Sequence, residues 1–155
     1  MFIKFISYNF LRPIEVCRIQ IKDLNIDQKT ISFKAINKAL KTKIIPDIST
    51  LKPEDYLFTP DKTGGNWETT EQNKRDYFSK RFKKVVKDHF NLGKDYGLYS
   101  FRHTYITKLY RKTTSPHKAK SRLMLITGHS TMIALEKYLR DIDAELPEDY
   151  SALIR

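Results

Sequence analysis

Residues able to bind and attack a phosphate group lie in two short stretches in the second half of the chain. Tyr99, Arg102 and His103 form one stretch, and in the other His129 precedes Tyr138 by nine positions. Arginine neutralises phosphate oxygens through two parallel charge-assisted hydrogen bonds. A tyrosine attacks phosphorus once a base or nearby cations favour its phenolate, since the ordinary pKa of the phenol is about 10. These residue types predict phosphodiester transfer on DNA without a metal ion or a cofactor.

Further candidate residues lie in the first half of the chain. Pro13 favours the first turn of a helix, so Arg12 is expected at a helix junction, where Glu15 accepts a hydrogen bond from its guanidinium. Taken alone, this segment is better explained by an ordinary exposed ion pair between Arg12 and Glu15. Lys38 is a candidate proton donor for a departing 5′ oxygen, because neighbouring cations lower the pKa of a lysine.

Basic residues on two segments are candidates for contact with a DNA backbone. They are Lys34, Lys41 and Lys43 near an expected hairpin tip, and Lys80, Arg81 and Lys84 on an expected amphipathic helix. For the hairpin lysines taken alone, a merely solvated surface is the favoured interpretation, whereas for the helix both interpretations stay open. Lys and Arg number 29 against 18 for Asp and Glu, and the formal net charge of +11 favours a polyanionic partner, here double-stranded DNA. Ribosomal and membrane-surface proteins share such a balance.

The composition narrows the class of protein. A hydrophobic share of 40% indicates a folded chain. The single cysteine, Cys17, excludes an internal disulfide and a CxxC metal site, which favours a cytoplasmic location. The apolar segment 1–6 is too short to span a bilayer, so no membrane partner is expected. A metal-dependent nuclease is least favoured, because no ligand spacing recurs among Asp23, Asp27, Asp55 and Asp61.

Hydrophobic periodicity predicts an α+β chain that is mainly α-helical and forms one domain over residues 1–155. Helices are expected over 2–11, from Pro13, over 70–91 with a cap at Gly93, from the N-cap Ser100, over 123–127 and over 131–140. Strands over 30–33, 43–46 and 56–59 are expected to form a small three-stranded antiparallel sheet on one side, with segment 34–42 as a hairpin tip. A helix capped by Ser100 places Arg102 in its first turn, where backbone N–H groups favour an anion.

Several motifs together resemble the ordered signature of the tyrosine recombinases, also called phage integrases. They are the string Leu11-Arg12-Pro13-Ile14-Glu15-Val16, Lys38 before Ile44-Ile45-Pro46, the string Ser100-Phe101-Arg102-His103-Thr104, and Gly128-His129-Ser130 followed by Tyr138. The resemblance runs from about residue 5 to residue 140. Each motif is short, but their order and separations make a chance match unlikely to arise.

The resemblance implies a role for each matching residue. Arg12 and Arg102 would hold the scissile phosphate, and Tyr138 would attack it to give a 3′-phosphotyrosyl bond. Lys38 would protonate the departing 5′ hydroxyl, and His129 would hydrogen-bond a phosphate oxygen. The position of Lys38 is counted back from the following strand, so a neighbouring lysine is the alternative. His103 would give a supporting hydrogen bond.

The chain departs from the family's pattern at one position and in its extent. The family usually has a histidine for acid–base transfer three residues before the second arginine, where this chain has Tyr99. The family also has an N-terminal DNA-binding domain, for which this chain leaves no room. A helical catalytic domain alone is therefore expected, monomeric when isolated and a homotetramer on paired DNA sites.

Two other functions stay open beside site-specific recombination for the integration or excision of a mobile element. A type IB topoisomerase uses a similar set of residues but rejoins the same strand. A DNA-binding regulator with an inert site would bind DNA without forming any covalent bond to it.

Overall fold

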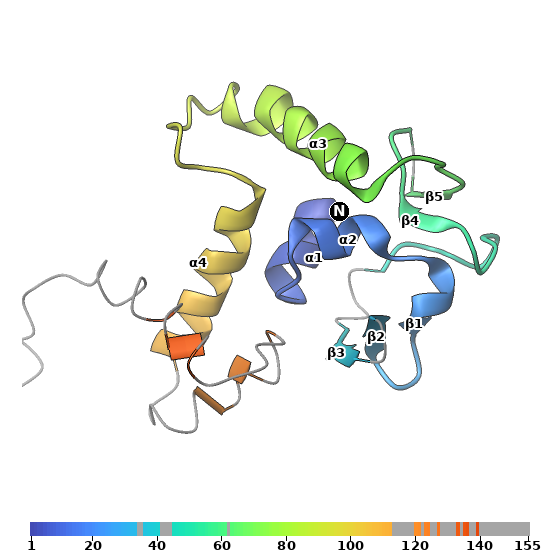
Figure 1. Ribbon diagram of the computed structural model, residues 1–155, viewed down its shortest axis with the longest axis horizontal. Helices are drawn as coiled ribbons and strands as arrows, with labels where there is room; N and C mark the ends of the chain where they lie inside the picture. Colours follow the sequence, from blue (N-terminus) through green and yellow to red (C-terminus); the bar gives the residue numbers. More distant parts are fainter. Residues whose placement is uncertain are drawn as a thin grey trace, which may run out of the picture. The chain divides into compact units, whose positions relative to one another are not determined.

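The computed structural model describes residues 1–33, 36–40, 45–61, 63–112, 120–121, 123–124, 127, 133, 135–136 and 139. The chain divides into two compact units, Met1–Ile106 and Thr107–Arg155. Both α-helices and β-strands occur in the first unit, so the predicted α+β class is confirmed (Figure 1).

Two short helices open the first unit, and both follow from the sequence. Helix α1 (Phe2–Tyr8) completely buries Phe5 and Ile6, two of the apolar residues that predict it, but it ends at Tyr8 and not at residue 11. Helix α2 (Pro13–Arg18) begins at Pro13, as expected. Proline suits the first turn because it has no backbone N–H that this turn would leave without a partner. Between the helices, Phe10 takes the left-handed backbone conformation, with φ of 53°. This sharp turn sets where the chain enters α2.

A first antiparallel sheet contains β1 (Leu24–Asn25), β2 (Thr30–Phe33) and β3 (Ile36–Ala39), in that order. A short 3₁₀ turn, η1 (Ile21–Asp23), leads into β1. Strand β2 is the predicted strand, and among the described residues it pairs with β1 on one edge and with β3 on the other. Ile45 and Pro46 belong to no strand, while residues 41–44 lie outside the described residues. Lys38 is therefore in a strand, opposite Ile31, and not in a hairpin tip.

A second antiparallel sheet pairs β4 (Tyr56–Phe58) with β5 (Thr63–Gly65). The segment 56–59 was expected to join β2 as a third strand, and this expectation is wrong. Its link to the rest of the unit is an isolated bridge between Gln20 and Tyr56, supported by the Leu57 N–H donating to the Ile19 carbonyl at 2.8 Å. Strand β4 is thus hydrogen-bonded to the residues that follow α2 and not to the first sheet.

Helix α3 (Glu71–Phe82) continues into a π-helical turn, η3 (Lys83–Lys87). Its N-cap is Thr70, whose side chain accepts a hydrogen bond from the Asn73 N–H at 3.2 Å. The helical run ends at Asn91, which has φ of 50°, and not at the expected Gly93. Asparagine tolerates the left-handed conformation better than most residues, so it serves as the terminator here.

Helix α4 (Leu98–Arg111) starts earlier than predicted. The Ser100 side chain does not cap the helix from outside; its oxygen lies within the first turn and accepts the Gly97 N–H at 3.0 Å. Arg102 therefore lies in the second turn, so the expected help from N-terminal N–H groups of the helix does not apply to it. Leu98, Arg102 and Ile106 lie on one buried face at i, i+4 spacing.

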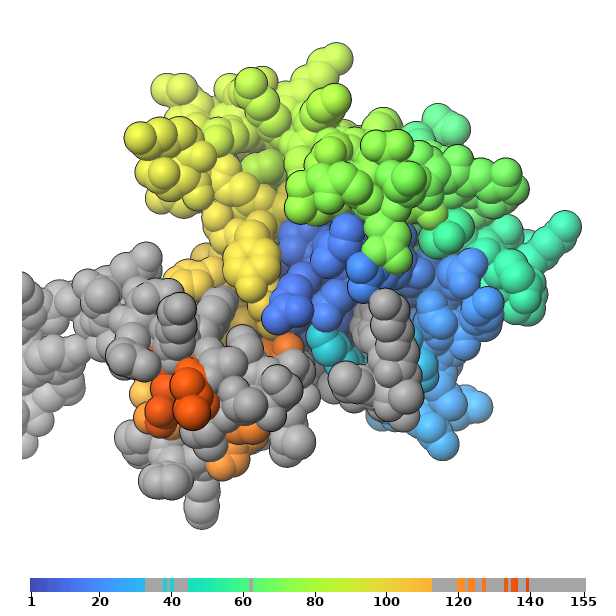
Figure 2. Space-filling view, in the orientation of Figure 1, coloured from blue at the N-terminus to red at the C-terminus, as the bar shows by residue number. Residues whose placement is uncertain are grey.

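The core of the first unit lies around α1 and α2. On the face shown in Figure 2, the blue atoms of these first residues are bordered by the green atoms of α3. Phe2 stacks on Phe78 with ring centroids 4.1 Å apart, and Phe58 meets the edge of Phe2 at 5.4 Å. Offset and edge-to-face aromatic pairs of this kind stabilise a core beyond the area they bury.

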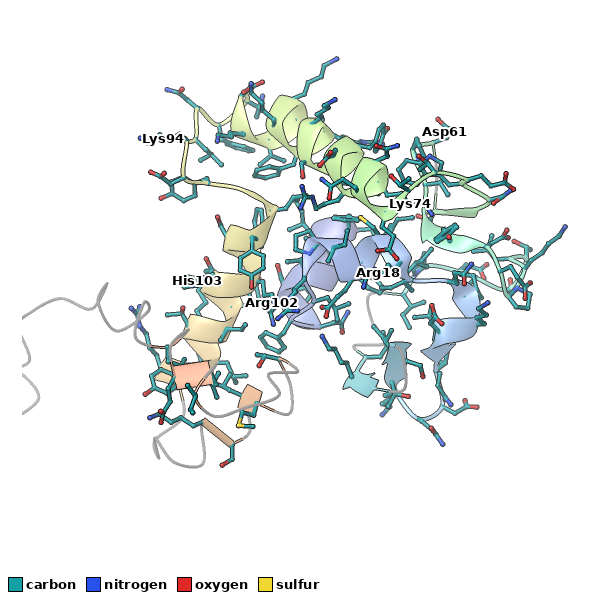
Figure 3. The ribbon with its side chains drawn as sticks, in the orientation of Figure 1. Arg18, Asp61, Lys74, Lys94, Arg102 and His103 are labelled. Atoms are coloured by element: carbon teal, nitrogen blue, oxygen red, sulfur yellow. The ribbon has the colours of Figure 1, made fainter. Side chains whose placement is uncertain are left out.

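One lysine belongs to this core, and the sequence did not identify it. Lys74 of α3 is only 2% exposed, and its ammonium lies 3.0 Å from the centroid of the Tyr56 ring (Figure 3 labels Lys74). The negative face of the ring attracts the cation. This contact joins α3 to β4.

In the second unit the described residues are few. Lys120 and Glu136 form an ion pair at 3.2 Å, and the Thr127 hydroxyl donates to the Leu123 carbonyl at 2.6 Å. Leu123, Leu135 and Leu139 are buried, which is consistent with helical packing. Among the helices that the structure describes, none has both the length and the apolar character that crossing a bilayer requires.

Candidate active site

Arg102 is the most deeply buried of the candidate residues that the structure describes, with no exposed surface. Its Nε donates to the Phe10 carbonyl at 2.8 Å, and its Nη1 donates to the Tyr99 hydroxyl oxygen at 2.7 Å. Figure 3 shows Arg102 extending from α4 toward α1 and α2. The side chain therefore joins segments 92 positions apart and holds its charge at a fixed place.

Phe10 is a functional candidate that sequence reasoning missed. Its left-handed conformation, φ of 53°, costs about 1 kcal/mol for a residue other than glycine. The conformation sends its carbonyl to Arg102, so the charge-assisted hydrogen bond offsets the cost. No pattern in the sequence predicts a phenylalanine at positive φ.

Glu15 connects the two candidate cations of the first half of the chain. One carboxylate oxygen accepts the backbone N–H of Arg12 at 2.7 Å, and the other accepts from Lys38 Nζ at 2.7 Å. The expectation that Glu15 would accept from the Arg12 guanidinium is thus wrong. That guanidinium is exposed and pairs with none of the described residues. Glu15 instead fixes the start of α2 and the ammonium of Lys38.

Lys38 is a buried cation whose pKa is affected by several charged neighbours. Its side chain is only 6% exposed, and burial is the main cause that lowers its pKa. The Glu15 carboxylate acts against burial and raises the pKa, while Arg102 and Arg12 lower it further. Two arginines from distant parts of the chain thus act on one lysine.

Tyr99 completes the group of described residues at the site. It lies in the first turn of α4 and is 42% exposed. Its hydroxyl oxygen accepts from Arg102, so the phenolic proton remains available for a second partner. The group as a whole combines an exposed guanidinium, a phenol donor and a lysine with a lowered pKa, which suits an anionic oxygen.

His103 follows Arg102 and is turned about 100° from it around the helix axis, as α-helical geometry requires. Figure 3 shows the two labelled side chains leaving α4 on different sides. His103 is half-buried and is not part of the contacts that join Arg102 to Phe10 and Tyr99.

The candidate DNA-binding residues of α3 and η3 make no described contact with the residues of this site. Lys80 and Lys84 are exposed. Arg81 is also exposed, but its guanidinium donates to the Pro60 carbonyl at 2.7 Å. Five other candidates, Lys34, Lys41, Lys43, His129 and Tyr138, lie outside the described residues.

The described residues offer no cluster of three or more His, Cys, Asp or Glu side chains that could hold a metal ion. The chain was also compared with protein-family models, with curated proteins and with solved structures, and none of these comparisons finds a match.

Proposed function

We propose that the chain is a tyrosine-type site-specific recombinase domain that cuts and rejoins DNA through a 3′-phosphotyrosyl intermediate, in the integration or excision of a mobile element. The observation that supports this most is a set of hydrogen bonds that links the candidates. Glu15 accepts from both the Arg12 N–H and the Lys38 ammonium, and Arg102 donates to the carbonyl of Phe10, two positions before Arg12. These residues were selected from separate motifs, and motifs that met by chance would scatter over the fold.

In the proposed reaction, the scissile phosphate lies against the exposed Arg12 guanidinium and receives a hydrogen bond from the Tyr99 hydroxyl. The positive charge of Arg102 lies behind Tyr99 and reaches the phosphate through this hydrogen bond. Preorganised donors of this kind stabilise the charge that develops on the phosphate oxygens.

The Tyr138 hydroxyl would pass its proton to His129 or to a phosphate oxygen as its oxygen attacks phosphorus. The bond to the 5′ oxygen breaks in the same step, and Lys38 would transfer a proton to that oxygen. Burial and the two arginines lower the Lys38 pKa, which makes its ammonium a better acid. Rejoining is the reverse: a 5′ hydroxyl attacks the phosphotyrosine and returns the proton to Lys38. The bond energy is kept in the covalent intermediate, so no nucleotide cofactor is needed. Strand exchange between two duplexes would require a homotetramer, with the isolated domain monomeric.

The first experiment detects the covalent intermediate. A pool of nicked double-stranded DNA with randomised sequence traps the intermediate, because the short cleaved strand diffuses away. We expect a protein–DNA adduct that survives denaturing detergent, and its loss in Tyr138→Phe. The matched control is Tyr96→Phe, since Tyr96 is 57% exposed and outside the site. An adduct that persists in Tyr138→Phe would contradict the proposal.

The second experiment tests the role of Lys38. Lys38→Met should slow cleavage by about 10²–10⁴-fold, the usual contribution of general acid catalysis. A substrate with sulfur in place of the 5′ bridging oxygen needs no proton on its leaving group, so it should restore cleavage by Lys38→Met but not by Arg12→Met. Lys52→Met, at an exposed position, is the control. Equal rescue of both variants would remove Lys38 from the role of acid.

A DNA-binding regulator with an inert site is the second candidate. The complete burial of Arg102, and Tyr99 in place of a histidine, favour it. This function predicts salt-dependent DNA binding with no adduct on any nicked substrate. If adducts do form, relaxation of a supercoiled plasmid without exchange between two sites would indicate topoisomerase-like activity.

A further inference from the structure

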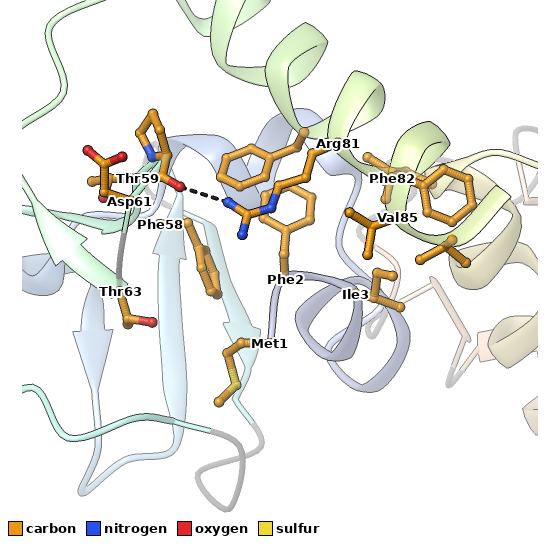
Figure 4. A pocket seen from close by; sticks show the side chains of 14 residues that line it. Met1, Phe2, Ile3, Phe58, Thr59, Asp61, Thr63, Arg81, Phe82 and Val85 are labelled. Carbon is orange, nitrogen blue, oxygen red and sulfur yellow. Dashed lines mark hydrogen bonds between the residues drawn. The ribbon is translucent and has the colours of Figure 1, made fainter. Parts of the chain in front are cut away.

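A cavity of about 390 Å³ lies in the first unit between the start of α1, the turn from β4 to β5, and the end of α3 with η3 (Figure 4). Its wall is mainly apolar and includes Phe2, Ile3, Phe58, Phe78, Phe82 and Leu98. Met1 and Val85 also line it and are 50% and 58% exposed, so the cavity opens to solvent. None of the residues of the candidate active site lines it.

Arg81 supplies a positive charge at this cavity. Figure 4 shows its side chain extending from α3 toward the turn from β4 to β5, with a hydrogen bond of 2.7 Å to the Pro60 carbonyl. The same nitrogen, Nη1, also donates to the Tyr77 hydroxyl oxygen at 3.4 Å. Both hydrogen bonds use Nη1, and Nε and Nη2 make none within the described part of the chain. Asp61 lines the cavity too, yet it forms no ion pair with Arg81 among the described residues.

We propose that this cavity binds an alkyl carboxylate, with the alkyl chain against the aromatic wall and the carboxylate on Arg81. The volume falls within the range of about 300–1,000 Å³ typical of small-molecule sites. An apolar wall gives no hydrogen bonds to a polar ligand, whereas one guanidinium with two unused donor groups suits a single anionic head. Binding at this site does not depend on the proposed recombinase function.

Asp61 restricts where the head group lies. Its carboxylate repels an anion, so the ligand's carboxylate must approach Arg81 from the side of α3 and η3, next to Val85. A neutral head group would gain nothing from Arg81, and a cationic head group would be repelled by it. The proposal therefore ranks the three head groups: carboxylate first, alcohol second, quaternary ammonium last.

Calorimetric titration of the full chain with straight-chain ligands below their micelle concentrations tests this ranking. In the series butanoate, hexanoate and octanoate, affinity should rise about fourfold for each added methylene, the effect of removing one such group from water. Octanoate should bind about tenfold more tightly than 1-octanol, because it forms a charge-assisted pair with Arg81. Binding should also shift the methyl resonances of Met1 and Val85 in nuclear magnetic resonance spectra.

Variants separate the cavity from general effects of charge. Arg81→Met should weaken octanoate about tenfold and leave 1-octanol unchanged. Arg75→Met is the matched control, since Arg75 is exposed on the same helix but does not line the cavity, and octanoate affinity should stay the same. Val85→Glu places a negative charge beside the head group and should also weaken octanoate without unfolding the protein, because Val85 is largely exposed.

Three outcomes would overturn the proposal. They are the absence of binding by the whole carboxylate series, equal affinity for octanoate and octyltrimethylammonium, and equal weakening by Arg81→Met and Arg75→Met. Unfolding by Arg81→Met would not remove the test, because Val85→Glu and the comparison of head groups on the unaltered chain examine the same site.

Discussion

Glu15→Gln is the most informative substitution for the candidate active site, because Glu15 is the carboxylate on which Lys38 depends. The ion pair is short, 2.7 Å, and the side chains of Lys38 and Glu15 are only 6% and 14% exposed. Removing one partner of a buried pair leaves an uncompensated charge, which costs about 3–5 kcal/mol. Glutamine keeps an oxygen that still accepts a hydrogen bond, so we expect a loss near 3 kcal/mol, the lower end of that range.

This loss should depend on pH in a defined direction. The pKa of Lys38 is lowered in the folded protein from its ordinary value of 10.5, and Glu15 is the group that opposes the lowering. Without the charge of Glu15 the folded pKa falls further. Between the folded pKa and 10.5 the unfolded chain binds more protons than the folded chain, so stability rises with pH in this window. The window is wider in Glu15→Gln, and the destabilisation should shrink from pH 7 toward pH 10.

Urea unfolding of both proteins at pH 7 and pH 9.5 measures the effect. A double-mutant cycle with Lys38→Met isolates the pair, since Glu15→Gln should cost less than about 1 kcal/mol when no ammonium is present. If the loss is the same at both pH values, or the same with Lys38→Met, the ion pair does not have the importance assigned to it.

Three further predictions concern residues outside this pair. In Arg102→Lys the ammonium cannot reach both acceptors of the buried guanidinium, so urea unfolding should give a free energy of unfolding about 2–4 kcal/mol lower. The same change at exposed Arg75 should alter this free energy by no more than about 0.5 kcal/mol. Burial raises the pKa of the Cys17 thiol to about 12, so a disulfide reagent at pH 8 should modify this thiol only as fast as the protein unfolds. Rapid modification of the native protein would contradict this prediction. Gly64 has φ of 82°, and a Cβ there would lie 2.3 Å from the Leu51 side chain. Gly64→Ala should therefore lower the free energy of unfolding by about 1–3 kcal/mol. Gly93→Ala is the control and should not cause this loss, because a Cβ there makes only an ordinary contact.

Local signals predicted the parts of the fold that depend on near neighbours. Phe5 and Ile6 with their helical spacing predicted α1, and Pro13 predicted the first residue of α2. Alternation over 30–33 predicted β2. In each case the pattern within a few residues decides the conformation, because the alternatives leave apolar surface in water or a backbone group without a partner.

Choices between two nearby solutions were not predictable from the sequence. Serine is favourable at the N-cap of a helix and also at the third helical position, where its oxygen accepts the N–H of the N-cap residue. Ser100 occupies the third position and accepts the N–H of Gly97. Its apolar residues favour segment 43–46 as the partner of β2, whereas among the described residues β3 forms this ladder. Burial of Leu40, whose N–H donates to Lys29 at 2.7 Å, favours this register, and such a long-range contact has no local signal.

Residue type and order select Arg12, Glu15, Lys38 and Arg102 as candidate site residues, but they do not indicate which of these side chains contact one another. Sequence spacing suggested a pair between Glu15 and the Arg12 guanidinium, whereas the carboxylate binds Lys38, which lies 23 positions away. A salt bridge three residues away and one to a distant strand are chemically equivalent, and only tertiary packing chooses between them.

The charges at this site are difficult to explain by stability alone. Burial is the main cause that lowers the pKa of Lys38, Arg102 and Arg12 lower it further, and Glu15 is the carboxylate that acts on that lysine. Apolar side chains of similar size would serve a purely structural role at least as well, because a buried ion pair seldom stabilises more than the packing it replaces. An excess of positive charge held in place by Phe10 and Glu15 is instead what an anion requires. It follows that a bound phosphodiester should raise the stability of the first unit, and that the gain should be smaller in Arg12→Met, whose exposed guanidinium is the one placed to meet it.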